Sequence, residues 1–143
     1  MKNLTIGLFG LKNIGRGLYD VLERINSQSV TIKTICVRNL AKNRGVEAHF
    51  TDNPDDIFED KDINLIVELI DDADAAYDIV KRALKKRIPV VSGNKKMLAY
   101  HIIELIDLQE QYNTPLLYDA SACGSIPVIR NLEEYYDNDL LCS

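Results

Sequence analysis

The first residues whose types and spacing could do chemistry are two glycines and a lysine near the start of the chain. Gly10 and Gly15 hold the first and third places of a G-x-G-x-x-G pattern, in which they form a tight turn and allow close helix–strand packing. Lys12 holds the second place, where a glycine normally lets the backbone approach a pyrophosphate. Asn13 and Ile14 follow at the start of a predicted helix, whose unpaired N–H groups and dipole attract phosphate. These residues predict a dinucleotide phosphate loop, in which Lys12 either pairs with a phosphate or obstructs the groove; a plain strand–turn–helix corner is the alternative.

A second candidate is Arg38, at the end of a predicted strand over residues 30–37. A carboxylate at such a position binds the ribose 2′-hydroxyl of NAD, but residues 36–39 contain none. The planar guanidinium of Arg38 instead suits a 2′-phosphate. The sequence therefore favours NADP and leaves NAD open. A solvated basic loop that also holds Lys42 and Arg44 is the other interpretation.

A third candidate group follows the predicted strand over residues 88–93. Ser92, Asn94 and Lys95 fall at its carboxyl end, which is where open α/β sheets bind ligands. Asn94 is also a good helix N-cap, which would be a purely structural role. Lys95 and Lys96 would place cations at a helix N-terminus, against the helix dipole. Contact with a cofactor or an anionic substrate would explain that placement.

A fourth segment, over residues 116–132, is rich in small residues. Gly124 leads to Pro127, which suits the first turn of a helix. A loop of this composition leaves carbonyl groups free to bind a cation or a ligand. A tight connection into the next helix explains it equally well.

The elements that must position these residues alternate between strand and helix. Crossovers of helix length require parallel neighbours, so the pattern predicts an α/β fold with a Rossmann-like, doubly wound parallel sheet. Strands are predicted over 3–9, 30–37, 49–53, 63–70, 88–93 and 114–121, and helices over 14–25, 73–87, 95–112 and 127–136, with a helical turn over 54–60.

Composition fits one acidic domain in a reducing compartment. The 143 residues are 46% hydrophobic and 27% charged, and their formal net charge is −5. The acidic balance argues against nucleic-acid and anionic-membrane partners. Cys36, Cys123 and Cys142 form no C-x-x-C pair, which favours thiols used in packing. No signal-peptide pattern and no run of ~20 apolar residues occurs, so a cytoplasmic protein is expected.

Four segments, in this order and spacing, resemble the N-terminal nucleotide-binding half of homoserine dehydrogenase. They read GLFGLKNIGRGLYDVL, INLIVELI, VVSGNKKMLA and LLYDASACGSIPVIRNL, and the resemblance covers essentially all 143 residues. It implies reduction of L-aspartate 4-semialdehyde to L-homoserine with NADH or NADPH, on the route to threonine and methionine.

The resemblance also assigns residues. It implies that residues 10–17 hold the pyrophosphate, that Arg38 favours the 2′-phosphate, and that Leu69 and Ile70 line the cofactor cleft. Lys95 matches a lysine beside the cofactor and the active site, so it is the candidate catalytic residue. Backbone oxygens would hold a sodium ion at Asp119, Ala122, Gly124 and Ile126.

The sequence departs from the family pattern at several of these places. Lys12 replaces the second glycine, and Asp71 and Asp72 stand where two glycines are common. These three departures put cofactor affinity in doubt, since the aspartates add negative charge near the cleft. Two further departures look mild, Asp119 for a usual glutamate and Ser125 for a usual glycine.

Residues 1–128 are expected to form the NAD(P)-binding domain, and residues 129–143 to begin a link into a substrate and dimerisation domain. By resemblance, the substrate-binding acids, the proton-donating lysine and the surface of a homodimer lie beyond Ser143. The chain is thus expected to be a piece of a longer enzyme and inactive alone. Two other functions stay open: a non-catalytic NAD(P)-sensing domain, and a related dehydrogenase for another aldehyde or amino acid.

Overall fold

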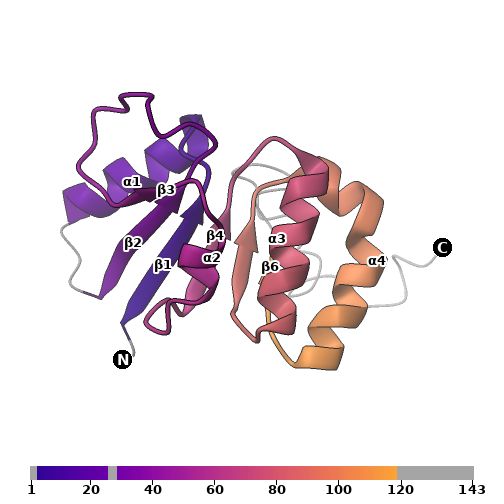
Figure 1. The fold of residues 1–143 in the computed structure, drawn as a ribbon. Helices are drawn as coiled ribbons and strands as arrows, with labels where there is room; N and C mark the ends of the chain where they lie inside the picture. The colour runs from indigo at the N-terminus through magenta and orange to yellow at the C-terminus, as the bar shows by residue number, and fades with distance from the viewer. Residues whose placement is uncertain (1–2, 26–28, 119–143) are drawn as a thin grey trace, which may run out of the picture.

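The computed structural model describes residues 3–25 and 29–118, which form one parallel sheet with helices on both faces (Figure 1). The strand order is β3-β2-β1-β4-β5-β6, and every neighbouring pair is parallel. The elements are β1 (Leu4–Phe9), α1 (Asn13–Ile25), β2 (Val30–Cys36), β3 (Phe50–Thr51), α2 (Asp55–Phe58), β4 (Leu65–Glu68), α3 (Ala73–Lys85), β5 (Val90–Ser92), α4 (Lys95–Tyr112) and β6 (Leu116–Leu117). The predicted doubly wound α/β fold is confirmed.

The direction of winding reverses between β1 and β4. The chain runs outward from β1 through β2 to β3, and then returns to the other side of β1 to lay down β4, β5 and β6. Loops that leave the carboxyl ends of β1 and β4 therefore diverge to opposite faces of the sheet. A crevice at such a switch point is where open α/β sheets bind ligands.

Alternating residues of the strands build two cores, one on each face. Phe9 and Ile66 belong to the core beneath α2, α3 and α4, which includes Val80, Leu84 and Leu105. Leu8, Ile35 and Val67 belong to the opposite core, against which Leu18 and Leu22 of α1 pack. Successive side chains of a strand point to opposite faces, so β1 contributes a large apolar side chain to each core.

The elements predicted within residues 3–25 and 29–118 are present, but several boundaries differ. The strands predicted over 63–70 and 88–93 contract at both ends, to Leu65–Glu68 and Val90–Ser92, which are the residues paired with the neighbouring strands. The strand predicted over 114–121 is Leu116–Leu117 within the described residues. The helix predicted over 127–136 and the domain boundary after residue 128 lie outside the part that the structure describes.

One face of α1 is less buried than its apolar spacing predicted. Leu18 and Leu22 pack on the sheet, whereas Ile14, Val21 and Ile25 are exposed. In α3 the apolar spacing predicts five inward residues. Ile79 is partly buried, and the other four are fully buried: Ala76, Val80, Ala83 and Leu84. Within residues 3–25 and 29–118, no helix combines the length and the apolar character needed to cross a membrane.

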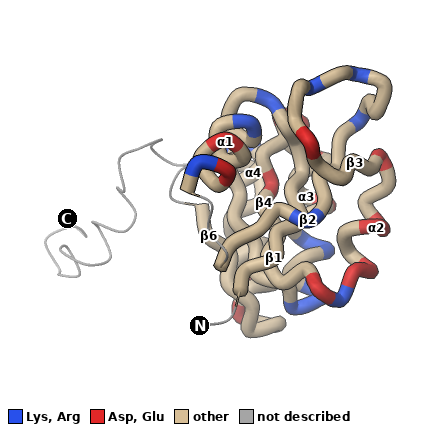
Figure 2. The backbone as a smooth tube through the Cα atoms, turned by 90° about the vertical axis from the view of Figure 1, so that its left-hand side faces the viewer, with Lys and Arg blue, Asp and Glu red and all other residues tan. Residues whose placement is uncertain are grey.

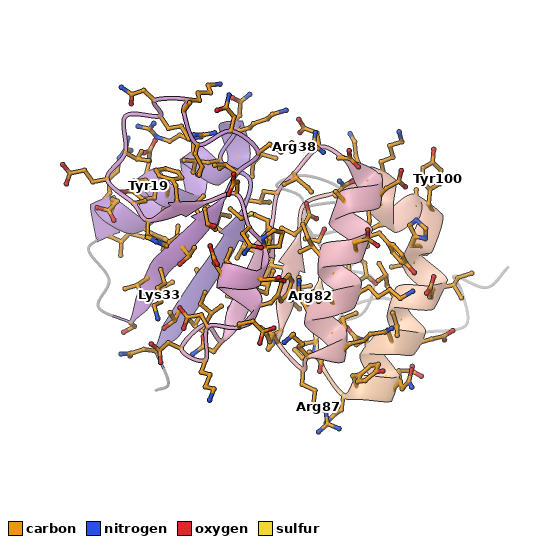
Figure 3. The ribbon with its side chains drawn as sticks, in the orientation of Figure 1. Tyr19, Lys33, Arg38, Arg82, Arg87 and Tyr100 are labelled. Atoms are coloured by element: carbon orange, nitrogen blue, oxygen red, sulfur yellow. The ribbon has the colours of Figure 1, made fainter. Side chains whose placement is uncertain are left out.

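Ion pairs and rings attach the short α2 to α3. Arg82 of α3 lies over the ring of Phe58 at 4.2 Å and pairs with Asp55 at 2.7 Å (Figure 3). Lys86 pairs with Glu59, one residue past α2, at 2.8 Å. A helix of four residues cannot be stable by itself, so these contacts hold it against the core.

Candidate functional site

A pocket of about 300 Å³ opens at the carboxyl ends of β1, β2 and β4. It lies at the switch point of the sheet, between the loop after β1 and the loop that joins β4 to α3. Its walls are mainly apolar, with charged side chains added from both loops. The lining residues are 9–12, 36–38 and 69–72, together with Asp52, Pro54, Ala75 and Ile79.

The glycine turn has the geometry that the sequence predicted. Gly10 adopts φ +93°, and a Cβ there would lie 2.8 Å from the carbonyl oxygen of Leu69. A Cβ on Gly15 would lie 2.2 Å from the carbonyl oxygen of Gly10. Both clashes are with backbone atoms, which cannot turn aside. Gly10 therefore makes the tight turn, and Gly15 lets α1 begin directly against the end of β1.

The helix that follows presents its N-terminus beside this turn. α1 begins at Asn13, and its first turn contains no acidic residue. The first amides of a helix have no partner within it, and the helix dipole adds positive potential there. Asn13 and Ile14 are exposed at this end, and Gly15 is buried below them. None of the three lines the pocket itself; they flank its rim.

Two ion pairs cross the pocket. Lys12, after β1, pairs with Asp71, and Arg38, after β2, pairs with Asp72 at 2.8 Å. The Oδ1 atom of Asp72 also accepts hydrogen bonds from the amides of Asp74 and Ala75, which caps α3. The amide of Ala75 and then the guanidinium of Arg38 lower the pKa of Asp72 below its ordinary value. Asp72 is therefore a stable anion on the wall opposite Arg38.

Arg38 begins the basic loop that joins β2 to β3. Figure 2 shows several Lys and Arg positions along this loop, which carries Arg38, Lys42 and Arg44. Its far side is fixed to α1, since Arg16 donates to the carbonyl oxygen of Arg44 at 2.8 Å and Tyr19 to that of Glu47 at 3.0 Å. The loop is thus a basic surface attached beside the phosphate turn.

A buried carboxylate connects the loops after β4 and β5. Glu68 is fully buried, and it accepts hydrogen bonds from the amide of Ile70 at 2.7 Å and the hydroxyl of Ser92 at 2.6 Å. Asn94 donates from its side chain to the carbonyl oxygen of Ile70 at 3.0 Å. Burial raises the pKa of Glu68, and the two hydrogen bonds oppose that rise. Leu69 and Ile70 are thereby held at the pocket wall.

The sequence analysis did not single out Glu68. The signal that could have found it is a carboxylate inside the otherwise apolar strand INLIVELI. An acidic residue on a strand buried on both faces requires hydrogen-bond donors nearby. Those donors come from Ile70 and Ser92, and Ser92 lies on a different strand.

The structural role expected of Asn94 is confirmed. Its side chain caps α4 by accepting a hydrogen bond from the amide of Met97 at 2.9 Å. Lys95 and Lys96 are exposed in the first turn of that helix, outside the lining of the pocket. Lys95 therefore stands at the carboxyl edge of the sheet, next to the loop that Glu68 fixes.

The pocket also holds one thiol. Cys36 is buried at the end of β2, and burial raises its pKa to about 11. A thiol with that pKa is protonated at neutral pH and is a poor nucleophile. This agrees with a packing role. The other cysteines, Cys123 and Cys142, lie outside the described residues.

The structure brings together only some of the predicted site residues. Gly10, Lys12, Arg38, Leu69 and Ile70 line one pocket, while Ser92, Asn94 and Lys95 stand one strand further along. The described part of the chain has no cluster of three or more His, Cys, Asp or Glu residues that could hold a metal. The predicted sodium ligands Asp119, Ala122, Gly124 and Ile126 lie outside that part.

Comparison with known proteins places this arrangement in a family. Residues 10–119 match the family model described as homoserine dehydrogenase, NAD binding domain. Homoserine dehydrogenase from Helicobacter pylori is 35% identical over 140 residues, which cover 93% of this chain and 33% of that relative.

Solved structures of homoserine dehydrogenases have the same fold as this chain. The homoserine dehydrogenase of Thiobacillus denitrificans superimposes with a TM-score of 0.82 at 30% identity, over 93% of this chain and 33% of that one. A hyperthermophilic archaeal homoserine dehydrogenase mutant, in complex with NADPH, has the same fold at 21% identity, with a TM-score of 0.77 over 95% of this chain and 50% of that one. The chain spans about a third of the length of the curated relatives that it matches. It belongs to the family of homoserine dehydrogenase NAD-binding domains.

Proposed function

We propose that this chain binds NADPH or NADH as the nucleotide-binding half of a homoserine dehydrogenase. The whole enzyme would reduce L-aspartate 4-semialdehyde to L-homoserine. The observation that carries the proposal is the pocket at the sheet's switch point, whose rim is the tight Gly10 turn and the N-terminus of α1. Residues 1–128 would form this unit, and residues 129–143 would lead toward the part that binds substrate and forms a homodimer.

The residues present fit a dinucleotide. A side chain at Gly10 or Gly15 would collide with backbone atoms. The two glycines therefore allow the turn to lie directly against the N-terminus of α1. The pyrophosphate would lie over residues 10–15, where helix amides and the ammonium of Lys12 supply positive potential. Arg38 would pair with a 2′-phosphate, which favours NADPH over NADH.

Two residues would hold the reactive end of the cofactor, and a buried hydrogen-bond network would keep them in place. Leu69 and Ile70 would form the wall, since Glu68 and Asn94 fix the backbone of Ile70 through its amide and its carbonyl oxygen. Ser92 is the residue through which β5 joins that network. The bound nicotinamide supplies hydride chemistry, and these residues keep its position constant.

Lys95 would act through its charge. Negative charge develops on the carbonyl oxygen as an aldehyde is reduced, and a nearby cation stabilises it. Lys95 is exposed at the carboxyl edge of the sheet, in the first turn of α4. A proton donor would come from the remainder of the enzyme.

A calorimetric titration of the protein with NADPH, and separately with NADH, tests the cofactor proposal. NADPH should bind more tightly, and Arg38→Ala should weaken NADPH by a factor of about 10 to 100, the range for a charged hydrogen bond. NADH should change much less, because it lacks the 2′-phosphate.

The control is Lys33→Ala, which removes a cation from the middle of β2, outside the lining of the pocket. Lys33 pairs there with Asp60 and Asp62, and Figure 3 shows it far from Arg38. This variant should bind both cofactors as the parent does. Failure of both cofactors to bind at millimolar concentration would contradict the proposal.

A further inference from the structure

We propose that Asp72 sets the cofactor selectivity of this site and that Asp71 sets its overall affinity for both cofactors, because each competes with a different phosphate group for a cation on the opposite wall. Asp72 competes with the 2′-phosphate for Arg38, and Asp71 competes with the pyrophosphate for Lys12. The inference rests on the proposed cofactor site and deepens it.

The two ion pairs connect opposite walls of one pocket. Lys12 and Arg38 come from the loops after β1 and β2, whereas Asp71 and Asp72 are consecutive residues of the loop from β4 to α3. All four residues line the pocket. A dinucleotide that enters must therefore pass between each cation and its carboxylate or displace the carboxylate.

The two carboxylates are held differently. Asp72 uses Oδ1 to cap α3, through the amides of Asp74 and Ala75, and offers Oδ2 to Arg38. It cannot swing away from the pocket without uncapping the helix. Asp71 pairs with Lys12 between side chains that are 71% and 75% exposed. Asp72 is thus a fixed competitor, and Asp71 a mobile one.

Exposure limits the strength of both pairs. The Arg38 side chain is 79% exposed, and ion pairs in water contribute little to stability. A phosphate dianion can displace a single carboxylate from an arginine, because it carries more charge and more acceptor oxygens. The aspartates therefore reduce affinity without preventing binding.

The chemistry of the two cofactors makes the two competitions separable. Only NADPH carries a 2′-phosphate, so the competition at Arg38 weakens NADPH alone. Both cofactors carry the pyrophosphate, so the competition at Lys12 weakens them equally. Asp72 then determines the ratio of the two affinities, and Asp71 determines their common level.

Matched neutral variants test this. Asp72→Asn removes the charge and keeps a good helix N-cap. It should tighten NADPH about fivefold, the upper range for an exposed ion pair, and NADH by less than about twofold. Asp71→Asn should tighten both cofactors by the same factor. In the Arg38→Ala background, Asp72→Asn should have no selective effect on NADPH, because the cation for which it competes is gone.

A second capping variant, Asp72→Ser, separates the charge from the fold. It should reproduce the shift in selectivity, and a melting temperature near that of the parent would show that α3 is intact. Equal effects of Asp72→Asn on both cofactors, or no effect on either while the parent binds, would overturn the inference and leave the cofactor site standing. Failure of the parent and of every variant to bind would overturn both.

Discussion

At the scale of single residues, Glu68 is a buried polar group on a strand that holds the loop following that strand in place. It is fully buried between β4 and β5, and its two oxygens hold Ile70 and Ser92. A buried carboxylate costs free energy unless donors satisfy it. The buried carboxylate fixes the backbone at Ile70, and Ile70 forms part of the pocket wall.

Glu68 also predicts how stability depends on pH. Its pKa is raised above 4.5, so the folded protein binds this proton more tightly than the unfolded chain. Stability then falls as the pH rises from about 4.5 through the raised pKa, by at most about 1.4 kcal/mol per pH unit. Glutamine does not titrate, so the stability of Glu68→Gln lacks this contribution to the pH dependence. The free energy of unfolding of the parent, minus that of Glu68→Gln, should therefore decrease as the pH rises.

Urea unfolding of both proteins at several values between pH 5 and 8 would check this. All other titrating groups are shared, so the difference isolates the carboxyl of Glu68. A difference that stays constant, or one that increases with pH, would show that Glu68 is not a strained buried acid.

At the scale of elements, the junction between β1 and α1 depends on Gly15, and Gly17, two positions later in the same helix, provides a matched comparison. A Cβ on Gly15 would meet the carbonyl oxygen of Gly10 at 2.2 Å, whereas a Cβ on Gly17 would meet nothing within 4 Å. Gly15→Ala should lower the free energy of unfolding by about 1–3 kcal/mol, because the strand end and helix must separate. Gly17→Ala should raise it by roughly 0.5–1 kcal/mol, since alanine favours the helix.

Denaturant unfolding of the two variants compares the same substitution two residues apart in one helix. NADPH affinity adds a second measurement: Gly15→Ala should weaken it, because the start of α1 moves away from the Gly10 turn. Similar stability losses in both variants would mean that α1 does not begin as tightly against Gly10 as described.

Helices and strands are also the features that could be predicted best from the sequence. Apolar runs with period 2 and period 3.6 indicated the strands and helices within a few residues, because periodicity reports burial directly. The glycine turn and the Asn94 cap followed from backbone requirements that are local. The exposed face of α1, with Ile14 and Val21, was not predictable from spacing, because apolar periodicity does not show how wide the buried stripe is.

Long-range pairs were beyond such reasoning. Lys12 and Asp71 are separated by 59 positions, and Arg38 and Asp72 by 34. Each of the four residues is a candidate from the sequence alone, yet nothing in a single sequence shows that they pair. Their pairing depends on the return of the chain from β3 to β4, which places consecutive residues of one loop opposite two others.

At the scale of the whole molecule, the two edges of the sheet have different tasks. The carboxyl edge carries the pocket, the glycine turn and the charges of Lys12 and Arg38. At the other edge Lys33 pairs with Asp60 at 2.7 Å and with Asp62 at 2.8 Å, which fixes the loop before β4. Cofactor binding should thus change the environment of residues at the carboxyl edge and leave the opposite edge unchanged.

The most direct test of the cofactor site is a map of backbone amide chemical shifts as NADPH is added. The account predicts that the perturbed amides lie in residues 10–15, 36–38 and 69–72, while those around Lys33 and Asp60 at the opposite edge stay unchanged. Shifts confined to other surfaces, or no shifts at millimolar NADPH, would contradict the claim that the pocket at the switch point binds the dinucleotide.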